Sequence, residues 1–141
     1  MANEIIEKKL DQMKELLSEI RRLTGVPFGV FVKDLTVVRA AERNFQLIVD
    51  LASDINIQLL LESGKKTPDT YRQSFTDLGA AGIIDAQLAK KLADSAKIRN
   101  ILVHEYDFEE DYEKFYSSAK GLLPSYDEYM KVIYTHIKGK K

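Results

Sequence analysis

Four polar side chains that could act together on a phosphate ester lie in one short stretch of the chain. They are the guanidinium of Arg99, the amide of Asn100, the imidazole of His104 and the phenol of Tyr106. In a helix each residue advances by about 100°, so the four side chains would fall within roughly half of the helix circumference. A cation, an amide, an imidazole and a phenol in such proximity predict a site for a phosphate and its ribose.

The helix that carries these residues is predicted to begin at Asp85, a residue type that caps helix N-termini. Apolar residues alternate with the polar ones, which places the stretch beside a buried seam. Three small residues keep the helix thin, so that another helix can approach closely: Ala89, Ala93 and Ala96. Because Arg99 lies on the same side as these alanines, the pattern predicts that this face meets a second copy of the chain in a two-fold dimer.

Three more long helices are expected to surround this one. In residues 3–24 the apolar positions recur at intervals of four, three, four and three, which is the spacing of a helical seam. A second helix is predicted from an N-cap at Asp34 to about residue 62, and a last one begins in the acidic run 107–111. Pro124 falls inside the last helix, where we expect a kink or a break.

Two shorter segments connect the long helices. Residues 26–33 are apolar and are expected to form a buried connection that contains a helical turn. Thr67 and Pro68 predict an N-cap followed by proline at the first helical position, which would open a short helix ending near Gly79. The fold class predicted is all-α, an up-and-down four-helix bundle with one additional short helix, in a single domain spanning residues 1–141.

The composition excludes several kinds of protein. The 141 residues, 45% hydrophobic and 30% charged, contain no apolar run long enough to cross a membrane. The polar, acidic start differs from a secretory signal, and the absence of cysteine permits a reducing cytoplasm, where we expect the protein. Two histidines cannot form a His-rich metal site. The net charge of −1 gives no overall attraction to nucleic acid, so RNA binding requires a local patch.

The order Arg99-Asn100-x-x-x-His104-x-Tyr106 resembles the R-x4-H-x-Y signature of the HEPN superfamily, and more narrowly that of the HepT toxins. The run from Arg39 to Asp50 is also similar to that family's second helix, and the order of helices fits over nearly the whole chain. The resemblance implies an RNA-cleaving toxin, a homodimer with both motifs lining one cleft, and a partner antitoxin that is a minimal nucleotidyltransferase of the MntA type.

The resemblance also implies roles for the residues of the motif. RNA can be cleaved without a metal or cofactor when its own 2′-hydroxyl attacks the adjacent phosphate. His104 suits proton transfer because the pKa of histidine lies near neutrality, and Arg99 suits stabilisation of the pentavalent phosphorus. Asn100 would orient the imidazole or bind the phosphate. Tyr106 corresponds to the tyrosine that accepts AMP from the antitoxin, a modification expected to silence the nuclease.

Each of these residues also has an ordinary structural interpretation. Arg99 could pair with a carboxylate on the second helix, Asn100 could bond to a neighbouring helix, and Tyr106 could be a core aromatic residue. Carboxylates beside His104 favour a protonated imidazole, as a general acid needs, yet they repel RNA phosphates. The alternative functions are a non-catalytic HEPN module that binds nucleotides or partners a nucleotidyltransferase, and a helical interaction domain without a ligand.

Overall fold

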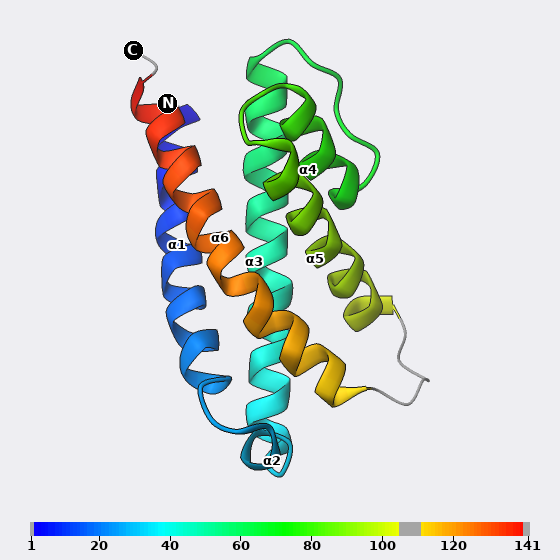
Figure 1. Cartoon of the computed structure of the whole chain (residues 1–141). Coiled ribbons are helices and arrows are strands. Elements are labelled where there is room, and N and C mark those ends of the chain that lie inside the picture. Colours follow the sequence, from blue (N-terminus) through cyan, green and yellow to red (C-terminus); the bar gives the residue numbers. More distant parts are fainter. Residues whose placement is uncertain (1, 105–110, 140–141) are drawn as a thin grey trace.

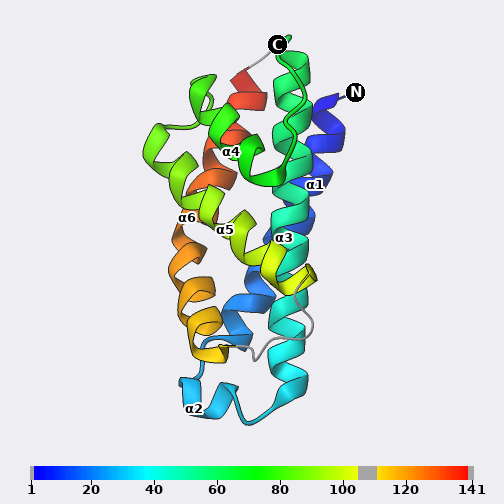
Figure 2. The same cartoon turned by 90° about the vertical axis from the view of Figure 1, so that its right-hand side faces the viewer.

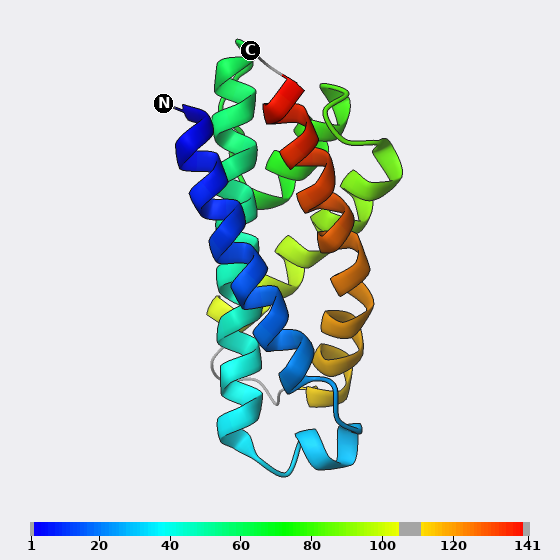
Figure 3. The ribbon, with the colours of Figure 1, turned by 90° about the vertical axis from the view of Figure 1, so that its left-hand side faces the viewer.

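The computed structural model describes the backbone of residues 2–104 and 111–139, and side chains within 3–103 and 111–139. All of its regular structure is helical, which confirms the predicted all-α class (Figure 1). The long helices α1, α3, α5 and α6 alternate in direction along the bundle (Figures 1 and 3). Within the described residues two short helices accompany them, where one was expected. The elements in chain order are α1 (Ala2–Leu23), α2 (Phe28–Phe31), α3 (Leu35–Glu62), α4 (Tyr71–Ala80), α5 (Ala86–His104) and α6 (Tyr112–Gly139).

The antiparallel pair α1 and α3 forms the longest contact of the bundle (Figure 3). The seam predicted for α1 is buried throughout, from Ile6 to Ile20, and it packs on a stripe of α3 that includes Phe45 and Ile55. Helix α6 lies against this pair, and its end returns to the start of α1, where Asn3 Nδ2 donates to the carbonyl of Ile137 at 3.2 Å. Burial of these apolar stripes is the main force that assembles the helices.

Helices α4 and α5 form a second antiparallel pair, which packs on α3 (Figure 2). They are joined by a tight turn in which Gly82 has a φ of +77°, a conformation that favours glycine. Asp85 caps α5 as predicted, since its Oδ1 accepts from the backbone N–H of Leu88 at 2.8 Å. Gly79 of α4 faces Ala89 of α5, and a Cβ built on Gly79 would lie only 2.6 Å from the Ala89 Cβ. The two small residues therefore allow the helices to approach closely.

The structure corrects two local expectations. The short helix begins at Tyr71 rather than at Pro68, because Thr70 is its cap and accepts from the N–H of Gln73 at 3.0 Å. The Gln73 side chain reciprocates by accepting from the N–H of Asp69 at 3.3 Å, as in a capping box. Helix α6 continues through Pro124 without a break. That proline is exposed, so the carbonyl one turn earlier can bind water instead of an N–H.

Buried hydroxyl groups link the two helix pairs through the core. Ser95 of α5 and Tyr126 of α6 share a hydrogen bond of 2.6 Å. One turn along α6, Tyr129 donates to Asn56 Oδ1 of α3 at 2.6 Å, and Asn56 Nδ2 donates to Ser74 Oγ of α4 at 3.0 Å. Burial raises the pKa values of Tyr126 and Tyr129 well above that of a tyrosine in water. This network fixes the position of α4 relative to α3 and α6.

None of the helices described is long and apolar enough to span a lipid bilayer.

Candidate active site around Arg99

Arg99 lies in the second-to-last turn of α5, on the side of that helix that packs against α3 and α4. Its Nε donates to Asp50 Oδ1 of α3 at 2.9 Å. Its Cζ lies 4.8 Å from the centre of the Tyr71 ring, at the start of α4. Its side chain is 16% exposed and that of Asp50 is 25% exposed. The guanidinium therefore lies where three helices meet, mostly covered but still in contact with solvent.

Tyr71 owes its position to the first turn of α4. The backbone carbonyl of Tyr71 accepts from Ser74 Oγ at 2.6 Å, and Ser74 in turn belongs to the buried network described above. The Tyr71 ring is half-buried, and its face meets the Arg99 cation, an attraction that strengthens as water is excluded. Burial and the nearby carboxylate of Asp50 raise the pKa of the Tyr71 phenol, so the hydroxyl stays neutral at physiological pH.

The structure describes the other residues of the predicted site to different extents. Asn100 is exposed, and its Oδ1 accepts from Arg99 Nη1 at 3.2 Å, so the structure brings these two predicted residues together. Helix α5 ends at His104, about 7.5 Å further along the axis than Arg99 at 1.5 Å per residue. The imidazole of His104 and the whole of Tyr106 lie outside the described residues.

The small residues of α5 have a different role from the one predicted. Ala89, Ala93 and Ala96 are buried within a single copy of the chain. The close approach of Gly79 to Ala89 shows that α4 of the same chain covers this face. The argument that drew a dimer from the alanine face is therefore wrong, because a partner within the chain already fills it.

The arrangement leaves part of the guanidinium able to bind an anion. Asp50 engages Nε and Asn100 engages Nη1, and within the described part of the chain Nη2 has no hydrogen-bond partner. A guanidinium has five N–H donors in a planar fork that matches phosphate oxygens. Arg99 can therefore hold a phosphate with its Nη end while Nε remains bound to Asp50.

Sequence reasoning missed Asp50 and Tyr71 as parts of this site. The sequence did suggest that a carboxylate on the second helix could pair with Arg99, and Asp50 is that carboxylate. Several acidic residues of α3 were possible partners, however, and no local pattern distinguished between them. Nothing in the local sequence of Tyr71 distinguished it from an ordinary core aromatic residue.

Comparisons with known proteins agree with the predicted fold and with the predicted family. The family model described as Ribonuclease HepT-like matches residues 13–133. The tRNA nuclease HepT of Aphanizomenon flos-aquae is 31% identical over 135 residues, which cover 94% of this chain and 90% of the relative. The mRNA nuclease HepT of Shewanella oneidensis is 31% identical over 108 residues, 74% of this chain and 77% of the relative.

A solved structure shares the arrangement of helices. It is described as the tri-AMPylated Shewanella oneidensis HEPN toxin in complex with MNT antitoxin. It superposes with a TM-score of 0.85 at 24% sequence identity, covering 93% of this chain and 97% of that chain. This likeness shows the fold alone. The family model and the curated relatives match the amino-acid sequence and therefore show the family. The chain described here belongs to the HepT-like ribonuclease family.

Proposed function

We propose that this protein is a metal-independent endoribonuclease, the toxin of a toxin–antitoxin pair, and that it cleaves RNA with Arg99 and His104. The observation that carries the proposal is the guanidinium of Arg99, which Asp50 holds and whose Nη2 has no hydrogen-bond partner among the described residues. Arg99 lies five residues before His104 in a member of the HepT-like ribonuclease family. The named relatives, a tRNA nuclease and an mRNA nuclease, support an RNA substrate.

The proposed reaction uses a nucleophile that the RNA itself supplies. The 2′-oxygen attacks the adjacent phosphorus while its proton passes to an imidazole. The bond from phosphorus to the 5′-oxygen breaks, and that oxygen takes a proton from an imidazolium. Arg99 stabilises the additional negative charge on the phosphorane oxygens, and it does so best because its orientation is fixed before the reaction. The products are a 2′,3′-cyclic phosphate and a free 5′-hydroxyl.

Purified protein should therefore cut single-stranded RNA in EDTA and leave cyclic phosphate ends. His104→Ala and Arg99→Ala should each abolish cutting, because one removes the proton carrier and the other the cation. Circular dichroism should show unchanged helicity in both variants. Undiminished cleavage by His104→Ala would contradict the mechanism, and cleavage that stops in EDTA and returns with a divalent ion would contradict metal independence.

We further propose that a minimal nucleotidyltransferase antitoxin silences the nuclease by transferring AMP to Tyr106. The fold neighbour in its AMPylated form and the matching position of the tyrosine in the motif support this. Each AMP would add bulk and a negative phosphate close to the motif, which repels RNA. Incubation with the antitoxin and ATP should add AMP to the intact mass of the wild type, and Tyr106→Phe should lose at least one such addition and stay active. An unchanged mass of the wild type would refute the proposed regulation by AMP transfer.

The expected assembly is a homodimer in the cytoplasm, with two motifs lining one cleft. A single motif offers one arginine and one imidazole, whereas the reaction needs a proton acceptor and a proton donor in the same step. Light scattering should give twice the chain mass at micromolar concentration. A monomer that cleaves RNA at full rate would exclude the shared cleft.

A further inference from the structure

Two residues outside the sequence motif hold the Arg99 side chain in place. Asp50 binds Nε from α3 at 2.9 Å, and the Tyr71 ring lies against the guanidinium from α4 at 4.8 Å. The hydrogen bond restrains the guanidinium at Nε, and the contact with the ring restrains the position of Cζ. The two contacts come from different helices, so together they restrict the orientations that the guanidinium can adopt.

We propose that Asp50 and Tyr71 are positioning residues, which orient the Arg99 guanidinium so that its Nη end faces the reacting phosphate. This inference rests on the proposed function, because it assigns the orientation a purpose in RNA cleavage. Without these contacts the arginine side chain would sample many rotamers and would have to lose that freedom in every turnover. With them, the donors are already aimed when the substrate arrives.

The number of hydrogen bonds between Asp50 and Arg99 shows whether Asp50 positions the arginine or competes with phosphate for it. A carboxylate that blocked the arginine would be expected to engage both Nε and Nη2, the paired edge that phosphate also uses. Asp50 makes one hydrogen bond, through Oδ1 to Nε, and Nη2 remains without a partner in the part of the chain that the structure describes. Asp50 therefore binds Nε of Arg99 and leaves Nη2 available to a phosphate.

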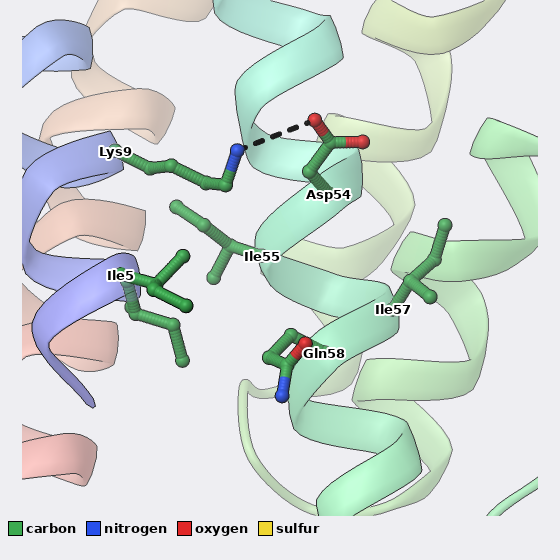
Figure 4. A pocket seen from close by; sticks show the side chains of 7 residues that line it. Ile5, Lys9, Asp54, Ile55, Ile57 and Gln58 are labelled. Atoms are coloured by element: carbon green, nitrogen blue, oxygen red, sulfur yellow. Dashed lines mark ion pairs between the residues drawn. The ribbon is translucent and has the colours of Figure 1, made fainter. Parts of the chain in front are cut away.

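The chain offers a matched control for Asp50. Asp54 lies one turn further along α3, and its carboxylate pairs with Lys9 of α1 at 3.6 Å (Figure 4). It is 50% exposed and contributes to the electrostatic environment of Tyr71, as Asp50 does. Asp50→Asn and Asp54→Asn each remove one negative charge from the same region. Only Asp50→Asn alters the bond to Arg99, so the pair separates positioning from a general change in charge.

Single-turnover and steady-state cleavage of a short RNA should be measured for both variants. We expect Asp50→Asn to lower kcat by about 10- to 100-fold with little change in KM, because the lost interaction acts on the transition state. Asp54→Asn should keep a kcat close to that of the wild type. A kcat for Asp50→Asn that is unchanged or higher would overturn the proposal, as would equal losses in the two variants.

A second pair of variants tests the ring. Tyr71→Phe keeps the aromatic face, whereas Tyr71→Leu removes it and keeps an apolar side chain of moderate size. Tyr71→Leu should lose kcat with little change in KM, and Tyr71→Phe should recover most of that loss. Equal kcat values for the two variants would show that the aromatic face has no part in orienting Arg99.

A measurement that needs no cleavage separates this inference from the proposed function. The ¹⁵Nε–¹H signal of Arg99, assigned by its loss in Arg99→Lys, should be protected from exchange in the wild type and in Asp54→Asn. It should broaden or vanish in Asp50→Asn. A protected signal in a protein that cuts no RNA would refute the proposed function alone. Full cleavage by Asp50→Asn, in which the protection is lost, would refute the positioning role alone.

Discussion

The close contact between α4 and α5 makes the substitution Gly79→Ala a sharp test of the packing. The added Cβ would lie 2.6 Å from the Ala89 Cβ, whereas carbon atoms pack best at about 3.5–4.0 Å. The two helices would have to separate by about 1 Å, since neither atom belongs to a flexible side chain. Overpacking of this kind typically costs about 1–3 kcal/mol.

The higher helix propensity of alanine stabilises Gly79→Ala and opposes the cost of overpacking, so a control variant is needed to subtract it. Alanine is favoured over glycine inside a helix by about 1 kcal/mol. Gly121 of α6 is exposed and helical, and a Cβ built there meets no atom within 4 Å. Gly121→Ala should therefore raise the free energy of unfolding by about 1 kcal/mol. The difference between the two variants isolates the overpacking, and we expect Gly79→Ala to be less stable than Gly121→Ala by about 1–3 kcal/mol.

Urea denaturation followed by circular dichroism would measure both free energies. Ala89→Gly combined with Gly79→Ala should restore part of the loss, because it removes the other methyl group of the clash; a coupling energy of about 0.5–3 kcal/mol is expected for residues in contact. Equal stabilities of Gly79→Ala and Gly121→Ala would refute the close approach of α4 and α5.

Two further predictions concern the cap of α4 and the buried phenols. Thr70→Ala should lower the free energy of unfolding by about 1 kcal/mol, whereas Thr67→Ala should change it by less than about 0.5 kcal/mol, as urea denaturation can show. The free energy of unfolding should also fall as pH rises above about 10, because the unfolded chain then loses tyrosine protons that the folded chain retains. Each buried phenol contributes a slope of about 1.4 kcal/mol per pH unit, so Tyr126→Phe should reduce the slope by that amount in denaturation at several alkaline pH values.

The long helices and most of their caps could be predicted from the sequence because they depend on local interactions. The seam of α1 and the caps at Asp34 and Asp85 each rest on residues within a few positions of one another. The motif that carries Arg99 and His104 is equally local, and it sufficed to indicate the family. The start of α4 was misjudged because both Thr67 and Thr70 are suitable caps, and only the reciprocal bonds with Gln73 favour Thr70.

The tertiary structure decided which neighbours cover each face. Periodicity showed that the alanine face of α5 approaches another helix, but not that this helix is α4 of the same chain. Asp50 and Arg99 are 49 residues apart, and their bond depends on the axial offset and crossing angle of α3 and α5. Those quantities follow from how all the side chains of the core fit together, and no single segment encodes them. The sequence therefore determined which residues carry the proposed chemistry, and the packing of three helices determined how Arg99 is held.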